Sequence, residues 1–245
     1  MIKIDLPSVK QTENSKSHTY PLQIAMQTLE FTQATLLYIM MLDYMSEKYL
    51  IQDKNLDKLR EDMISLGIKE KAWDDSFSYL AKYKEVFKRY VYQNVLIQIR
   101  SHWDWYIGHL ALFVLYAREY TSNTSSVKEK ELISIGYKSI EKQIEILEEA
   151  CDVSFNIYQN TIEQLKEMSW VRNLGIHNRW EVDEKYFKKT KSANWKIGQI
   201  RVFDNREIMT WHQSLVTVIN LTWPEIGKRF KKVPAYNHIN YKSVR

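Results

Sequence analysis

The chain has 245 residues, of which 44% are hydrophobic and 13% aromatic, and this content excludes an intrinsically disordered protein. The formal net charge of +5 at pH 7 favours an anionic partner. The single cysteine, Cys151, excludes an intrachain disulfide and indicates a cytoplasmic setting, and no apolar run reaches the ~18 residues of a membrane helix, so no membrane partner is expected.

The first half of the chain predicts long helices, because only 6 Gly and 4 Pro are available to interrupt them in the whole sequence. Residues 1–19 are polar and are expected to form an N-terminal arm. Apolar side chains recur at three- and four-residue steps from Leu22 to Leu50 and predict one helix there. A short helix follows over Asn55–Ser65. Lys69–Tyr120 is too long for a typical globular helix and predicts two helices with a break near residues 100–108.

The second half begins with the linker-like sequence Thr121–Ser126. An amphipathic helix is expected from Val127 to about Ala150, and another over Phe155–Arg172. Asp183–Lys189 predicts a short helix with Asp183 as its N-cap.

Residues 194–205 break the helical pattern and predict a short extended insert. A last helix runs from Glu207 to about Trp223, where Pro224 and the glycine beyond it are expected to end it. The expected fold is therefore an all-α bundle of long antiparallel helices. It forms a single domain over residues 20–230, followed by a basic, aromatic tail over 231–245.

The sequence Arg172-Asn173-Leu174-Gly175-Ile176-His177 carries the strongest chemical signal. Arginine is a permanent cation that can bind two phosphate oxygens at once, and histidine can transfer a proton near neutral pH. Together they suggest cleavage of a phosphodiester without a metal. On the preceding helix Arg172 falls about 20° from Leu165, within the apolar stripe, so it needs a partner or a polar pocket.

The stretch Val171–Thr190 resembles HEPN domains, whose motif is Arg, four to six residues, then His, often with a polar residue after the Arg. Arg172 and His177 match the motif, and Asn173 occupies the polar position. Asn178 and the residues that follow it are also similar. The resemblance implies a HEPN-like helical bundle that commonly acts as a homodimer. Many HEPN proteins are RNases in toxin or anti-phage systems, whereas others only bind.

Other roles are open for these residues. Arg172 can cap the helix C-terminus or pair with a buried carboxylate, and His177 can be a solvated loop histidine. If the helix continues, Asn173 and His177 share a face, whereas Gly175 also permits a helix end.

Three neighbouring carboxylates, Glu181, Asp183 and Glu184, indicate helix capping more than metal binding, so no metal is expected. Arg100 can reach a groove beside the motif, and the tryptophans are expected in the core or at a dimer interface. The sequence contains no GxxxxGK[ST], HExxH, paired CxxC or GxSxG motif, which disfavours NTPases, zinc enzymes and serine hydrolases.

The expected function is a metal-independent endoribonuclease of HEPN type, without a cofactor, that cuts single-stranded or looped RNA. His177 is expected to act as general acid or base, Arg172 to stabilise the transition state and Asn173 to orient the phosphate or the histidine. Further substrate-binding residues are expected at Asn178, Arg179, Lys228, Arg229, Lys231 and Lys232. The alternatives are an inactive HEPN-like binding or regulatory module of a larger defence complex, and a nucleotide-binding or nucleotide-modified toxin paired with a small transferase antitoxin.

Overall fold

The computed structural model describes residues 19–51, 53–72, 74–75, 84–121, 125–190 and 194–233. Its named elements are all helical, and an isolated bridge between Glu181 and Ile200 is the sole β-type pairing within these ranges. The elements are α1 (Thr19–Ile51), α2 (Asp53–Ser65), α4 (Lys84–Arg118), α5 (Glu129–Ile133), η1 (Ile135–Tyr137), α6 (Ile140–Cys151), α7 (Gln159–Asn178), α8 (Glu184–Thr190) and α9 (Asn205–Arg229). The predicted all-α fold is confirmed. Nearly all of the predicted arm and most of the predicted tail lie outside the described residues.

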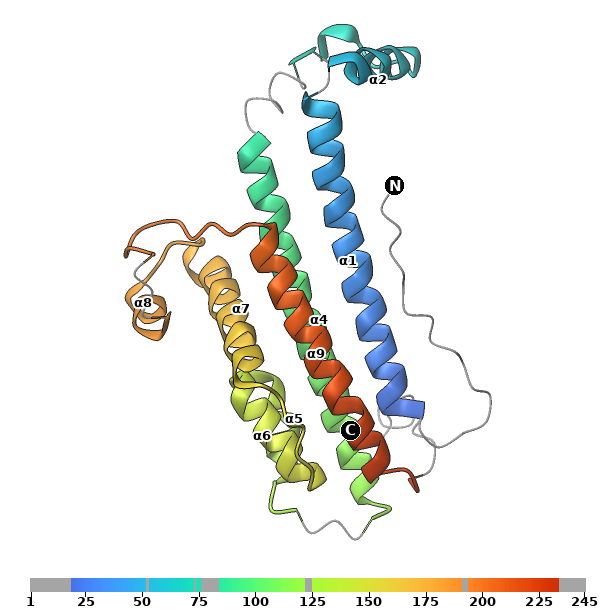
Figure 1. Ribbon diagram of the computed structural model, residues 1–245, viewed down its shortest axis with the longest axis vertical. Coiled ribbons are helices and arrows are strands. Elements are labelled where there is room, and N and C mark those ends of the chain that lie inside the picture. The colour runs from blue at the N-terminus through green and yellow to red at the C-terminus, as the bar shows by residue number, and fades with distance from the viewer. Residues whose placement is uncertain are drawn as a thin grey trace.

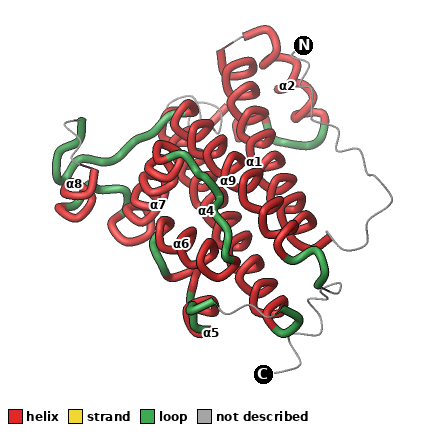
Figure 2. Tube along the Cα trace, turned by 60° about the horizontal axis from the view of Figure 1, so that its bottom comes forward, coloured by secondary structure: helices red, strands yellow, loops and turns green. Residues whose placement is uncertain are grey.

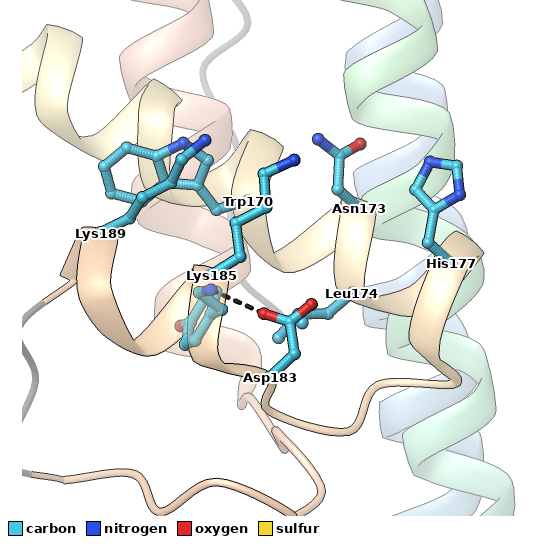
Figure 3. A pocket seen from close by; sticks show the side chains of 8 residues that line it. Trp170, Asn173, Leu174, His177, Asp183, Lys185 and Lys189 are labelled. Carbon is cyan, nitrogen blue, oxygen red and sulfur yellow. Dashed lines mark hydrogen bonds between the residues drawn. The ribbon is translucent and has the colours of Figure 1, made fainter.

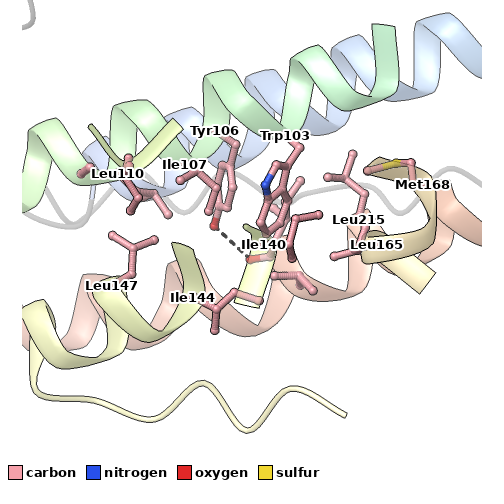
Figure 4. Packing of buried hydrophobic residues seen from close by; sticks show 14 of the residues in the cluster. Trp103, Tyr106, Ile107, Leu110, Ile140, Ile144, Leu147, Leu165, Met168 and Leu215 are labelled. Carbon is pink, nitrogen blue, oxygen red and sulfur yellow. Dashed lines mark hydrogen bonds between the residues drawn. The ribbon is translucent and has the colours of Figure 1, made fainter. Parts of the chain in front are cut away.

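Helix α4 is the centre of an elongated bundle and contacts α1, α7, α9 and the α5–α6 segment (Figures 1 and 2). The short helix α8 lies to the side of α7, away from the main bundle (Figure 1). Figure 4 shows the core between these helices, with large apolar side chains from α4, α6, α7 and α9. Its fully buried members include Trp103, Tyr106, Leu110, Leu147, Leu165 and Leu215. None of the helices in the described ranges is long and apolar enough to cross a membrane.

The predicted break near residues 100–108 is wrong, since α4 is continuous from Lys84 to Arg118. A glycine within a helix destabilises that helix by about 1 kcal/mol relative to alanine. Gly108 is the one glycine in α4. Buried side chains at every turn outweigh that cost, and Trp103, Ile107 and Leu110 around the glycine are each at most 1% exposed. Tertiary packing therefore decides the length of this helix.

Conversely, the single helix predicted over Val127–Ala150 is divided into α5, η1 and α6. Ser139 starts α6, because its side chain accepts a hydrogen bond from the Lys142 amide. The buried Gln143 then ties the segment to its neighbours, donating to the Ile135 carbonyl at 3.1 Å and accepting from Trp103 Nε1 at 2.6 Å. The interruption is held in place by buried polar contacts.

Helix α9 is longer than predicted at both ends. Asp204 and Glu207 form a capping box at its start. Pro224 lies inside the helix and does not end it, because the buried Ile226 and Phe230 hold the chain against the bundle. Helix α8 begins as predicted, with Asp183 Oδ1 accepting a hydrogen bond from the Tyr186 amide at 2.6 Å.

Two histidines pack against the bundle: His212 on α9 is buried, and His102 on α4 is half-buried. Among the described residues, neither His102 Nδ1 nor His212 Nε2 has a hydrogen-bond partner. Burial lowers the pKa of both rings, and His102 further lowers that of His212, to about 4. Both imidazoles are therefore neutral in the folded protein near neutral pH.

This burial predicts acid sensitivity. The unfolded chain, where the His212 pKa is ordinary, binds more protons than the folded chain between about pH 6.5 and pH 4, so the free energy of unfolding decreases as the pH falls through that window. Between pH 7 and pH 5, the free energy of unfolding is expected to fall by about 2 kcal/mol less in His212→Leu than in the parent protein. Urea denaturation of both proteins at the two pH values measures the difference. An identical pH dependence in the two proteins would contradict it.

Candidate active site at the end of helix α7

Helix α7 continues through the Arg-Asn-His motif and ends at Asn178, not at Arg172 as predicted. Arg179 and Trp180 then adopt left-handed backbone conformations, with φ of 52° and 69°, which reverse the chain. The Trp180 indole folds back onto Gly175, where a Cβ atom would lie only 2.3 Å from the ring. Gly175 therefore does not end the helix; it makes room for the tryptophan that follows it.

The continuous helix determines which motif side chains lie together. At about 100° per residue, Asn173 and His177 are about 40° apart, whereas Arg172 is about 140° from His177. The predicted shared face of Asn173 and His177 is thus present, and both side chains are exposed. Arg172 Nη1 donates a hydrogen bond to Asn173 Oδ1 at 3.1 Å. The asparagine therefore connects the arginine to the face that carries the histidine.

Asn173 and His177 line a pocket of about 220 Å³ between α7 and α8. Figure 3 shows them on one side, with Trp170 and Lys189 on the other. Lys185 extends toward the space between these two groups (Figure 3). The remaining lining residues are Leu174, Asp183 and Tyr186. Because Asp183 caps α8, its carboxylate is already engaged with a backbone amide.

Arg172 itself is half-buried between α7 and α4, and its Nε has no hydrogen-bond partner within the described part of the chain. Its charge reaches the Arg100–Asp104 ion pair of α4. Burial lowers the pKa of Arg100, Asp104 opposes this effect, and Arg172 adds to it. Burial also raises the pKa of Asp104, against the effect of the two arginines. Asp104 thus pairs with Arg100 and lies near a second guanidinium group, that of Arg172.

The other predicted binding residues divide into two groups, and the first lies beside the motif. Asn178 donates to the Glu181 carbonyl at 2.6 Å and so stabilises the turn after α7. Arg179 is the C-cap residue of α7 and its side chain is exposed.

The second group, the basic residues after α9, lies far from the motif. Helix α9 has 25 residues, about 37 Å in length, and its start, not its end, lies beside the C-terminal part of α7. At the far end Lys228 pairs with Glu225, and Arg229 donates to the Cys151 carbonyl at 2.9 Å. Lys231 and Lys232 follow and are exposed. The structure does not bring these four cations to the pocket.

Three residues that line the pocket were not predicted as site residues: Trp170, Lys185 and Lys189. Trp103 and Trp211 are buried as expected, but Trp170 is only half-buried and lines the pocket. Lys185 and Lys189 are four residues apart on α8, and this spacing was the available signal that they share a face. The position of that face relative to α7 is a tertiary property.

The neighbouring carboxylates do not converge. Asp183 caps α8, and Glu184 pairs with Lys188 at 3.0 Å. Across the ranges described, no group of three or more His, Cys, Asp or Glu side chains is placed to hold a metal ion.

Comparison with known proteins provides no relative for this chain. No protein-family model, curated protein or solved structure matches it. The chemistry of the pocket must therefore be inferred from its own residues.

The contact between Gly175 and Trp180 yields a stability prediction. Replacing Gly175 by Ala places a methyl group inside the indole ring, and such overpacking is expected to destabilise the protein by about 1–3 kcal/mol. Gly108→Ala is the matched control, because it lies in helix α4 with no atom within 4 Å of the added methyl group, and it should gain up to about 1 kcal/mol. Thermal denaturation of the three proteins tests this; equal stability of Gly175→Ala and the parent protein would show that Trp180 does not occupy this position.

Proposed function

We infer that the protein is a metal-independent endoribonuclease of HEPN type whose active site lies at the end of α7. The observation that carries the proposal is the shared, exposed face of Asn173 and His177 beside a pocket with two lysines. The hydrogen bond from Arg172 to Asn173 adds a fixed cation next to that face. These are the groups that phosphodiester cleavage requires: a proton carrier, hydrogen-bond donors and positive charge.

In the proposed reaction the 2′-hydroxyl of RNA attacks the adjacent phosphorus, and the bond from phosphorus to the 5′-oxygen breaks. The products are a 2′,3′-cyclic phosphate and a 5′-hydroxyl. His177 removes the proton from the attacking hydroxyl or delivers one to the leaving oxygen. Asn173 Oδ1 accepts from Arg172, which leaves its Nδ2 group available to donate to a phosphate oxygen. Arg172 stabilises the charge that develops in the transition state.

One chain supplies a single histidine at this face, whereas the reaction uses both an acid and a base. A second copy related by a two-fold axis would supply the other histidine. Ile176, next to His177, is 46% exposed and offers an apolar contact for such a partner. The proposed enzyme is therefore a homodimer with a composite site. A role as a toxin or anti-phage effector in the cytoplasm, with an antitoxin or defence partner, is part of the same proposal.

A second candidate function is an inactive HEPN-like module that only binds. The observation in its favour is the position of Arg172, about 140° around α7 from His177 and outside the residues that line the pocket. A single chain in this arrangement presents the cation and the proton carrier to different directions. Such a module would still bind RNA but would not cut it.

Loss of His177 distinguishes the two functions. His177→Ala is expected to lower the rate of RNA cleavage by about 10²-fold or more with unchanged helical content, because an acid/base group is lost. EDTA is expected to have no effect, and mass spectrometry should find 2′,3′-cyclic phosphate ends. Lys188→Ala is the control, since Lys188 is exposed and pairs with Glu184 outside the pocket. Full activity of His177→Ala, or activity abolished by EDTA, rules out this mechanism.

The composite site is tested by mixing chains. Parent protein titrated with an excess of His177→Ala is expected to lose more activity than dilution alone explains, since mixed dimers carry one histidine instead of two. Sedimentation at micromolar concentration should give a dimer. A monomer that still cuts RNA would exclude the composite site while leaving the role of His177 intact.

A further inference from the structure

The tryptophan in the pocket has two cations beside its ring. Lys166 Nζ lies 5.6 Å and Lys189 Nζ 5.5 Å from the centroid of the Trp170 indole. Lys166 is fixed by ion pairs with Glu141 at 2.6 Å and Glu163 at 2.9 Å, and only 18% of its side chain is exposed. Lys189 is exposed and has no ion pair among the described residues. Lys166 is therefore held by two carboxylates, whereas Lys189 is exposed and lies over the ring.

Helix α8 divides its lysines between two directions. Lys188 pairs with Glu184 at 3.0 Å and does not line the pocket. Lys185 and Lys189, one turn apart, both line it. Asp183, the only acidic residue among the lining residues, is engaged as the cap of α8. Lys185 and Lys189, which have no carboxylate partner in the described part of the chain, thus face Asn173 and His177 across the pocket (Figure 3).

We propose that this pocket binds one unstacked nucleotide of single-stranded RNA next to the phosphate that is cut, with the base stacked on Trp170 and the flanking phosphates held by Lys185 and Lys189. The inference rests on the proposed function for the identity of the ligand as RNA. Stacking of a base on an aromatic ring is stronger than a cation–π contact at an exposed site. The incoming base therefore displaces Lys189 from the ring. The ammonium group of Lys189 then pairs with a phosphate of the RNA.

The chemistry of the pocket favours this ligand over two others. In a duplex the bases are stacked and paired, so none can reach the Trp170 ring without being extruded. An acidic peptide would satisfy the lysines, but its Asp and Glu side chains have no aromatic face to stack on the indole. A flexible single strand satisfies both, and it is also the form in which the 2′-hydroxyl can align for attack.

Binding is measured by fluorescence anisotropy in the full-length His177→Ala protein, so that no RNA is cut. The probes are a labelled single-stranded RNA octamer and an octamer of the same backbone with abasic spacers. Trp170→Leu is expected to weaken binding of the ordinary octamer about tenfold and to leave the abasic octamer unchanged. Trp170→Phe should restore most of the loss, because it retains an aromatic face.

The lysines are tested through salt dependence. The double variant Lys185→Ala, Lys189→Ala should weaken binding of both octamers and reduce the slope of log K against log salt by about 1.4, which corresponds to two phosphate contacts on a single strand. Lys188→Ala is the matched control on the same helix and should leave the slope unchanged. A duplex of the same sequence should bind less tightly than the single strand and should not respond to Trp170→Leu.

Equal losses for the ordinary and abasic octamers in Trp170→Leu would overturn the stacking role and make Trp170 a structural residue. Adenosine monophosphate binding as tightly as the octamer would also overturn the proposal, because the pocket would then be a site for a free nucleotide. These measurements do not depend on cleavage. If the expected binding pattern is found but the parent protein cuts no RNA, only the proposed nuclease activity is refuted. If the parent protein cuts RNA but the binding pattern is absent, only this nucleotide site is refuted.

Discussion

Arg201 connects the three elements around the candidate site, and only 2% of its side chain is exposed. Its guanidinium contacts Glu167 of α7 at 3.2 Å, the hydroxyl of Tyr186 on α8 at 3.0 Å and the carboxylate of Glu207 on α9, and it lies 4.5 Å from the centroid of the Trp195 ring. Burial alone would lower the pKa of Arg201, but the hydrogen bonds and charges of Glu207 and Tyr186 raise it. Arg201 is the buried partner, whereas Glu167 and Glu207 are partly exposed, so removing the carboxylates would leave a buried guanidinium without compensation.

The pocket depends on this contact because α8 cannot hold its position alone. A helix of seven residues is too short to be stable in isolation, and α8 lies to the side of the bundle. Tyr186, the buried residue of α8, bonds to Arg201, while Asp183 caps the helix start. The turn at Arg179 and Trp180 then sets α8 beside the last turns of α7. Together these contacts orient α8 so that its lysines face the Asn173–His177 side of α7.

The two ends of the bundle carry different kinds of positive charge. At the motif end, Lys185 and Lys189 lack carboxylate partners in the described ranges, and Arg172 lies near the Arg100–Asp104 ion pair. At the other end of α9, Lys228 and Arg229 are engaged with Glu225 and the end of α6, whereas Lys231 and Lys232 are exposed. Cations that are already paired contribute less to binding an anion than unpaired ones. The unpaired lysines that line the pocket, more than the net charge, are therefore the basis for proposing an anion-binding surface beside α7 and α8.

The sequence by itself determined the all-α class, the long first helix, the cap at Asp183, the extended insert and the motif residues, because helical periodicity and capping are local properties. The capping box at Asp204 was not predicted. It also predicted that Asn173 and His177 share a face if α7 continues. Whether α7 continues was decided by Trp180, which packs on Gly175 from five residues away, and the unbroken α4 was decided by its burial in the core. Contacts between residues distant in sequence also decide three other features. These are the half-buried position of Trp170, the placement of α8 beside α7 and the burial of Arg201. No local pattern encodes such contacts, since each depends on how separate helices pack.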